Sequence, residues 1–195
     1  MAGFRYGVAL VLVVTVPTIM VYWFSVHSLI RFWRRVGLGL TLTTHLILYI
    51  ALAGTVIHWR RTLLQWDLGT QPVLIAIALA IGVVAVAMRR SIARHLKPRI
   101  QLGFPEIAPA QFASRLLTEG IFSRIRHPRY VNMFLAVLSF SLIANYLMGY
   151  VVVGVFAAEL FGVVLLEEKE LRERFGREYE AYMQRVPRFI PRLRP

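Results

Sequence analysis

Hydrophobic residues in this chain gather into five long runs that are separated by polar segments. A helix needs roughly 20 apolar residues to cross the hydrocarbon core of a bilayer. The pattern therefore predicts an all-α fold, a polytopic membrane bundle of about five transmembrane helices. The runs cover residues 6–29, 38–57, 72–88, 130–147 and 148–166.

The last two runs are joined by a short segment without charge, residues 145–149, which predicts an antiparallel hairpin. Ser139 and Ser141 interrupt the first arm and suit hydrogen bonds between helices. Glu159 lies within the second arm, where a charge is costly. Two interpretations of Glu159 stay open: a functional acid, or a protonated side chain that ties two helices together.

Two polar segments flank this hairpin. Residues 91–129 form the longer one, with prolines at positions 98, 105, 109 and 128, and predict a connector with short helical pieces. Residues 167–185 predict one helix, because Leu171, Phe175 and Tyr179 are spaced by four along one apolar face. Gly176 lies inside this predicted helix, and Pro187 follows its end.

Composition agrees with a membrane protein. Hydrophobic residues make up 57% of the chain, charged residues make up 17%, and the mean hydropathy is +0.60. The chain has no cysteine, which excludes disulfides, thiol nucleophiles and thiolate metal sites. Histidines at positions 27, 45, 58 and 95 are scattered without the spacing of metal ligands, so we expect no metal site.

Basic residues are distributed unevenly along the chain. The net charge is +13, and segments 31–35, 89–129 and 169–195 hold 20 of the 23 Lys and Arg residues. Basic segments beside apolar runs stay in the cytoplasm and contact anionic headgroups. We therefore expect membrane lipids as partners, and no nucleic acid. The N-terminus is predicted outside and the C-terminus inside, in the inner membrane if the source is prokaryotic.

The candidate chemistry lies in the second of two predicted parts. Residues 1–95 would form three N-terminal transmembrane helices, and residues 96–195 the connector, the hairpin and the C-terminal helix. A residue before proline is disfavoured in the α region, so His127 is expected at the mouth of the fourth span, ahead of Pro128. Arg126 and Arg129 flank it, and such a pair could hold a carboxylate or a phosphate.

Two carboxylates emerge on the same side of the membrane after the hairpin. Glu167 and Glu168 together could hold an ammonium group or act as a base. Glu168 and Arg172 are four residues apart on the predicted helix and face the same way. Each feature by itself also occurs in ordinary interfacial clusters, so the order of the whole set matters more than any one member.

Taken in order, these residues resemble the isoprenylcysteine carboxyl methyltransferase family, whose wider group includes membrane phospholipid N-methyltransferases. The resemblance spans residues 118–193, and the first three apolar runs carry no matching motif. It rests on residues 120–130, which read Gly-Ile-Phe-Ser-Arg-Ile-Arg-His-Pro-Arg-Tyr, then on Glu167-Glu168-x-x-Leu171, Phe175-Gly176-x-x-Tyr179-x-x-Tyr182 and Pro187-Arg188-x-x-Pro191.

The resemblance implies an S-adenosylmethionine-dependent methyltransferase with a cytoplasmic C-terminal helical region that binds the cofactor. The lipophilic small-molecule or lipid substrate would enter from the bilayer. The implied main activity is carboxyl methylation of a prenylcysteine-like substrate. The implied cofactor-binding residues are Arg126, His127, Pro128, Tyr130 and Glu167. Candidate catalytic residues are Glu167 and Glu168, with Arg172 and Arg188 to orient a carboxylate.

Departures from the family pattern leave the acceptor open. Phe122 stands where the family often has tyrosine, and Asn132 stands where it often has glycine. One alternative is a phospholipid N-methyltransferase, in which Glu167 or Glu168 would take the proton of an amine. Weaker alternatives are a membrane reductase similar to the sterol reductases and a non-enzymatic membrane protein.

Overall fold

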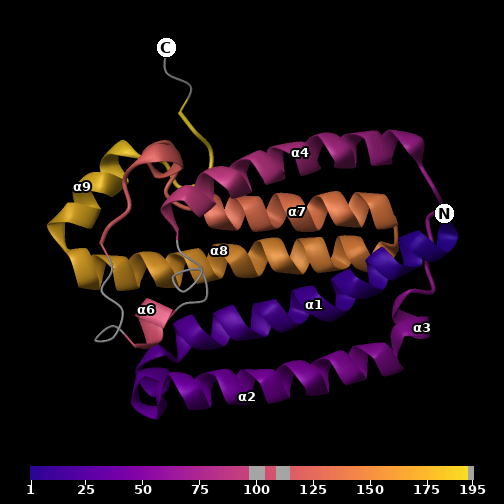
Figure 1. Ribbon diagram of the computed structural model, residues 1–195, viewed down its shortest axis with the longest axis horizontal. Helices are drawn as coiled ribbons and strands as arrows, with labels where there is room; N and C mark the ends of the chain where they lie inside the picture. The colour runs from indigo at the N-terminus through magenta and orange to yellow at the C-terminus, as the bar shows by residue number, and fades with distance from the viewer. Residues whose placement is uncertain (97–103, 109–114, 193–195) are drawn as a thin grey trace.

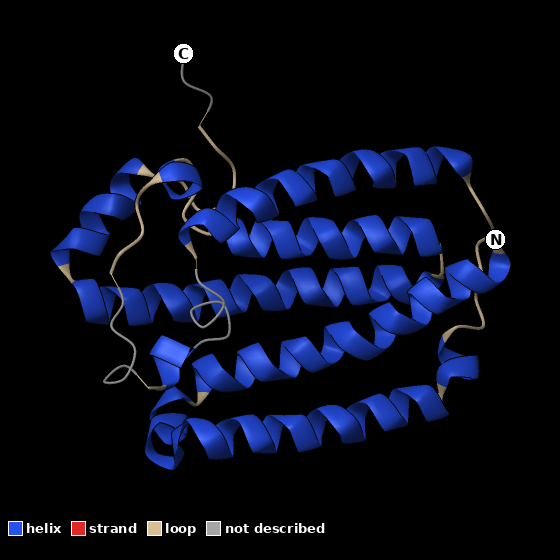
Figure 2. Ribbon diagram, viewed as in Figure 1, coloured by secondary structure: helices blue, strands red, loops and turns tan. Residues whose placement is uncertain are grey.

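The computed structural model describes residues 1–96, 104–108 and 115–192, and its long elements are all helices (Figures 1 and 2). Four helices are long and apolar enough to cross a membrane, and a fifth, of 17 residues, is shorter. The predicted all-α membrane bundle is therefore confirmed. The four are α1 (Ala2–Ser28), α2 (Ile30–His58), α4 (Pro72–His95) and α8 (Leu147–Phe175), and the fifth is α7 (Pro128–Ala144).

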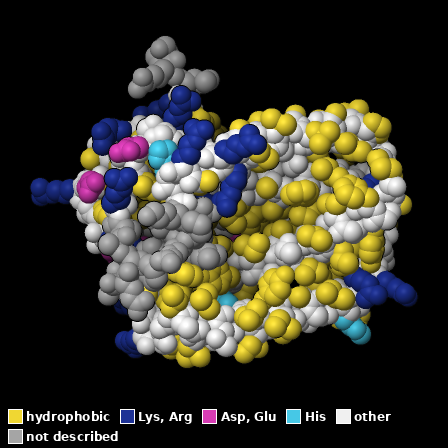
Figure 3. All heavy atoms as spheres, viewed as in Figure 1, with side chains coloured by type: hydrophobic (Ala, Val, Ile, Leu, Met, Phe, Trp, Pro, Cys, Tyr) yellow, Lys and Arg dark blue, Asp and Glu magenta, His cyan; other side chains and the backbone are white. Residues whose placement is uncertain are grey.

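The five long helices lie side by side in the order α4, α7, α8, α1 and α2 (Figure 1). Helix α1 contacts α2, α7 and α8, and α7 also packs against α4 and α8. Ala9 and Val13 of α1 and Val163 and Val164 of α8 belong to the main buried cluster. Large apolar side chains such as Val73 remain exposed on the outer faces, where a bilayer would cover them (Figure 3).

Polar side chains join α7 to α4 at close range, as the serine positions predict. The Ser139 hydroxyl donates to the Ala78 carbonyl at 2.8 Å, and the Asn132 amide donates to the Ala85 carbonyl at 2.6 Å. A Cβ added at Gly82 would lie 3.3 Å from the Ser139 hydroxyl. Small residues on α4 thus allow the two helices to approach each other.

The shorter elements connect the bundle at its two ends. Helix α3 (Arg60–Leu63) follows α2, and the described part of the connector holds α6 (Phe104–Ile107) and the 3₁₀ helix η1 (Gly120–Ser123). Helix α9 (Arg177–Arg185) follows α8. The connector prolines at positions 98 and 109 lie outside the described residues.

The hairpin turn is shorter than the sequence suggests. Helix α7 ends at Ala144 because Asn145 takes a left-handed conformation with φ of 53°, and Tyr146 is extended. Helix α8 then begins at Leu147 and continues to Phe175, beyond the predicted end of the fifth apolar run at residue 166. Glu167 and Glu168 therefore lie on the same helix as the last span.

The prediction of a single helix over residues 167–185 is wrong. Gly176 adopts φ of 52° and ψ of −129°, a conformation that side chains rarely allow, and separates α8 from α9. Its N–H donates to the Arg172 carbonyl at 2.9 Å, which closes the last turn of α8. The break lets α9 pack Tyr179 and Tyr182 against Leu171 and Phe175.

A buried arginine anchors the opposite end of the bundle. Arg5 of α1 donates from Nε to the Ala144 carbonyl at 3.0 Å and from Nη1 to the Thr70 hydroxyl at 3.2 Å. It also pairs with Asp67 in the segment between α3 and α4. The Asn145 side-chain amide donates to the Gly69 carbonyl at 2.8 Å. These bonds hold the hairpin turn against α1 and the α3–α4 segment.

Replacing Gly176 with alanine tests the break between α8 and α9. Because φ is positive at this residue, we expect Gly176→Ala to lower the free energy of unfolding by about 1–3 kcal/mol. Gly154→Ala is the matched control, because Gly154 lies within α8 and an added Cβ would meet no atom within 4 Å. Thermal unfolding in detergent measures both variants, and equal stability of the two would contradict the expectation.

Candidate functional site

The connector reaches the bundle through a glycine that lies against α4. Gly120 has φ of +60°, and a Cβ at this position would collide with the imidazole of His95. The 3₁₀ turn η1 starts there and buries Phe122, whose carbonyl accepts a hydrogen bond of 2.6 Å from the Tyr182 hydroxyl. The chain thereby passes between α4 and α9 as it approaches α7.

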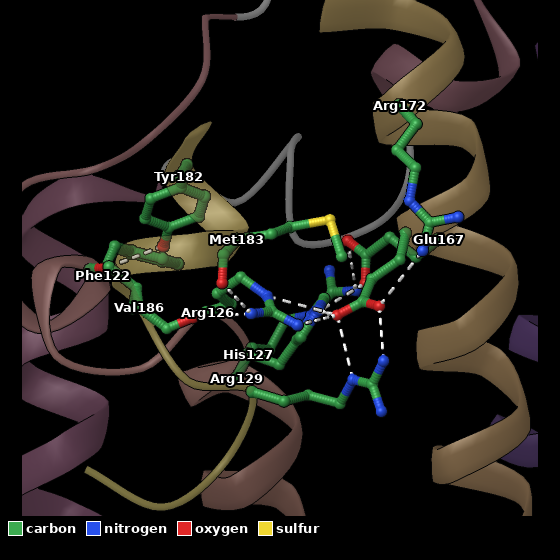
Figure 4. Close-up of polar contacts among 11 residues, drawn as sticks. Phe122, Arg126, His127, Arg129, Glu167, Arg172, Tyr182, Met183 and Val186 are labelled. Atoms are coloured by element: carbon green, nitrogen blue, oxygen red, sulfur yellow. Dashed lines mark hydrogen bonds and ion pairs between the residues drawn. The ribbon is translucent and has the colours of Figure 1, made fainter. Parts of the chain in front are cut away.

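His127 precedes the first turn of α7, and Pro128 occupies that turn, as the sequence predicts. The backbone N–H groups of Arg126 and His127 donate to the carbonyls of Pro187 and Arg188 at 2.9 and 3.1 Å. The segment after α9 therefore runs beside the segment before α7. Both segments face the end of α8 that carries the two glutamates (Figure 4).

The carboxylate of Glu168 is fully buried and surrounded by cations. Its Oε1 accepts from Arg126 Nη2 at 2.7 Å, and it lies 3.1 Å from His127 Nε2. Arg188 Nε donates to Oε1 at 3.0 Å, and Arg188 Nη2 donates to Oε2 at 2.7 Å. This carboxylate has little capacity left to accept a proton, because its lone pairs already meet charged donors.

Glu167 has a less saturated carboxylate. Its Oε2 lies 3.5 Å from His127 Nδ1, and its Oε1 lies 4.0 Å from Arg129 Nη2. Oε2 is buried and makes no hydrogen bond with any described residue. A buried carboxylate oxygen without a donor is costly, so this atom is suited to receive a donor from a bound molecule.

His127 is held between the two carboxylates, which favour its charged form. Burial lowers the pKa of His127, but the two carboxylates beside its ring raise the pKa by more, so the net shift is upward. The pKa of the Arg188 guanidinium is also raised, mainly by its hydrogen bonds to Glu168. The cluster thus contains more permanent positive charge than negative charge.

Two tyrosines border the cluster. Tyr130 is 2% exposed, and its hydroxyl accepts a hydrogen bond of 2.6 Å from Arg129 Nη2. The hydroxyl of Tyr179 is buried without a hydrogen-bond partner among the described residues. Burial raises the pKa of Tyr179 and raises that of Tyr182 to about 12, so both hydroxyls keep their protons.

The predicted site residues come together with unequal roles. Arg126 is occupied by protein acceptors, since it also donates to the Met183 and Val186 carbonyls at 3.1 and 2.6 Å. Arg172 stays at the edge, with a side chain 47% exposed and 3.8 Å from Glu168. Glu159 is half-buried and has no polar contact with the described residues, which leaves it outside this cluster.

The contribution of α1 could not be found from the sequence. The Arg129 guanidinium lies over the ring of Trp23 with its carbon 4.4 Å from the ring centroid. His27 Nδ1 lies 3.0 Å from the Glu170 carboxylate on α8. The first three apolar runs carry no motif that would signal either contact, although the position of Trp23 near a span end is typical of membrane helices.

Two cavities border the site, and Glu167 lines the first of them. One has a volume of about 380 Å³ and mixed charge, with Arg31, Arg34, Glu167, Glu170, Glu173 and Arg174 in its wall. The other is an apolar groove of about 310 Å³ between α7, α8 and the last described residues, bordered by Tyr130, Phe134, Phe161 and Phe189. The Phe189 ring also contacts His127, with 6.2 Å between ring centroids.

Comparison with protein-family models gives a match over the region that contains the site. A family model described as phospholipid methyltransferase matches residues 73–178, more than half of the chain. The matched region contains all of α4 except Pro72, the His127 segment, the hairpin and both glutamates. No curated protein matches the chain.

Removing the charge of Glu168 should destabilise the fold. We expect Glu168→Gln to lower the free energy of unfolding by about 3–5 kcal/mol, because Arg126, His127 and Arg188 would lose their shared counter-ion. Glu173→Gln, an exposed position on the same helix, is the control and should unfold like the wild type. Denaturation in detergent provides the measurement, and an unchanged Glu168→Gln variant would show that the ion cluster does not stabilise the fold.

The raised pKa of His127 predicts how stability depends on pH. A group whose pKa is higher in the folded state stabilises it fully below the unfolded pKa of 6.5, and this contribution is lost as pH rises through the folded value. Stability should therefore fall as pH increases above about 6.5. Thermal unfolding across pH should show a flatter profile for His127→Gln, while the exposed His58→Gln should keep the wild-type slope.

Proposed function

The chain belongs to the phospholipid methyltransferase family, whose members use S-adenosylmethionine, and we propose that it transfers a methyl group to the amine of a phospholipid at the membrane surface. Four long apolar helices make it an integral membrane protein. The family match supports a phospholipid acceptor over the prenylcysteine carboxylate that the motifs suggest. The single observation that supports an amine as the acceptor is that Glu167 Oε2 is buried without a hydrogen-bond donor among the described residues.

The mixed-charge cavity fits the amino-acid end of the cofactor. That end is a zwitterion, so it needs a cationic partner for its carboxylate and an anionic one for its ammonium. Arg31 and Arg34 would hold the carboxylate, and Glu173 on the opposite wall would hold the ammonium. When bound, S-adenosylmethionine supplies an electrophilic methyl group on a sulfonium.

Glu167 belongs both to this cavity and to the buried cluster, so we place the acceptor amine beside it. An ammonium must lose a proton before its nitrogen can attack, and Glu167 Oε2 is the acceptor for that N–H. Arg126, His127, Arg129 and Arg188 outnumber the two carboxylates. Excess positive charge lowers the pKa of a nearby amine, which favours the neutral nucleophile.

Glu168 would then be a positioning residue. Its carboxylate fixes Arg126, His127 and Arg188, and His127 in turn lies against Glu167. Methyl transfer is a displacement in line with the bond to sulfur, so its rate depends on the alignment of the two reactants. The basic segments near the site favour its location on the cytoplasmic face, with the N-terminus outside.

Methyl transfer from a labelled cofactor tests the proposal. The purified protein should label phosphatidylethanolamine in mixed micelles, and Glu167→Gln should lower kcat by about a hundredfold. Glu173→Gln should keep kcat, because Glu173 lies away from the acceptor, and should raise KM for the cofactor. If only a prenylcysteine carboxylate is labelled, the acceptor is a carboxylate and not an amine. If no lipid is labelled, methyl transfer is refuted.

A further inference from the structure

A third cavity has Arg129 in its wall, the side chain whose guanidinium lies near Glu167. It has a volume of about 450 Å³ and is bounded by α1, α2, α4 and α7. Its wall is mainly apolar and aromatic, with Ile19, Leu42, Leu46 and Met133 among the lining residues. Ile19, Leu42 and Leu46 are also exposed, so the apolar part of the cavity continues into the surface that a bilayer would cover.

Two arginines mark the polar end of this cavity. Arg89 comes from the last turns of α4, and Arg129 from the first turn of α7. A guanidinium has five N–H donors, so Arg129 can keep its bond to the Tyr130 hydroxyl and still meet another oxygen. Paired arginines beside an apolar wall suit a phosphate that is attached to hydrocarbon chains.

A buried histidine with one unmatched nitrogen also lines the cavity. His45 is 8% exposed, and its Nδ1 lies 2.7 Å from the Thr41 carbonyl, to which it donates. Its Nε2 is buried and has no partner among the described residues. The side chain is fixed between the rings of Tyr22 and Trp33, at centroid distances of 4.9 and 4.8 Å. A buried polar atom without a hydrogen-bond partner calls for an explanation, and a molecule bound in the cavity would supply one.

A phospholipid headgroup is long enough to reach from this cavity to the site of methyl transfer. Arg129 lines the cavity, and its Nη2 lies 4.0 Å from Glu167 Oε1. Two carbons separate the amine of an ethanolamine headgroup from its phosphate ester oxygen. A phosphate beside Arg129 would therefore leave the amine within reach of Glu167.

We propose that this cavity binds the phosphodiester of the acceptor lipid through Arg89 and Arg129, with His45 as a third polar contact and the acyl chains along the apolar wall. The inference rests on the proposed function and adds the site that selects phospholipids. Among the described residues, none of those that line the groove beside Phe134 and Phe161 is Lys or Arg, whereas two arginines line this cavity. The cavity beside Arg31 is assigned to the cofactor.

Matched variants distinguish the loss of a phosphate contact from the loss of one positive charge on α4. Arg89→Gln should raise KM for dioctanoyl phosphatidylethanolamine about tenfold at unchanged kcat, because Arg89 does not touch the reacting atoms. Arg90→Gln removes an equal charge from the next residue of α4, which does not line the cavity, and should keep the wild-type KM. His45→Phe keeps the ring and should weaken lipid binding, whereas the exposed His58→Phe should not.

Thermal stabilisation reports binding independently of turnover. With S-adenosylhomocysteine present, dioctanoyl phosphatidylethanolamine should stabilise the wild type more than dioctanoylglycerol, which lacks the phosphate. Arg89→Gln and His45→Phe should lose most of that difference. S-adenosylhomocysteine alone should stabilise every variant equally.

The outcomes distinguish the two proposals. Equal effects of Arg89→Gln and Arg90→Gln, or equal stabilisation by the two lipids, would overturn the phosphate site and leave the methyltransferase standing. Methylation of phosphate-free acceptors alone would also overturn it. If S-adenosylhomocysteine does not stabilise the wild type and no lipid is labelled, the proposed function itself is refuted.

Discussion

The buried carboxylate of Glu168 is the interaction on which the rest of the site depends. An isolated carboxylate out of water is strongly unfavourable, and this one is compensated by Arg126, His127 and Arg188. Its partners come from the segment before α7 and the segment after α9, which are far apart in the chain. The electrostatic requirement of one side chain therefore brings three parts of the molecule together and fixes the position of its neighbour, Glu167.

Much of the bundle could be predicted because membrane spans depend on length and apolarity. The apolar run at residues 72–88 predicts a span, and α4 covers these residues. The end of α8 could not be predicted in the same way. Its apolar run stops at residue 166, but Glu, Lys and Arg are good helix formers, so the helix continues to Phe175. The break at Gly176 depends on a backbone conformation that glycine permits without requiring it.

The sequence predicts which residues form the candidate site, but it does not predict the role of each residue. The sequence predicts that His127, Glu167 and Glu168 lie on one side of the membrane, since all three border the same hairpin. It could not distinguish the two glutamates, because adjacent helical residues face directions about 100° apart and only packing decides which carboxylate is saturated. His45 and Trp23 carry no motif, and their proximity to Arg129 depends on how α1 and α2 pack.

The polar contacts at the two ends of the α7–α8 hairpin have a mechanical consequence. Arg5 holds the turn at one end, and the Glu168 cluster holds the other, so a sliding motion of the hairpin along its axis would break charged hydrogen bonds. Helix α2 is attached differently: Trp33, Thr41 and His45 are its buried residues, and most of its surface is exposed. It also bends at Gly37, where φ is 82°. Helices α7 and α2 both line the cavity proposed for the lipid, so one wall of that cavity belongs to a hairpin that charged hydrogen bonds hold at both ends.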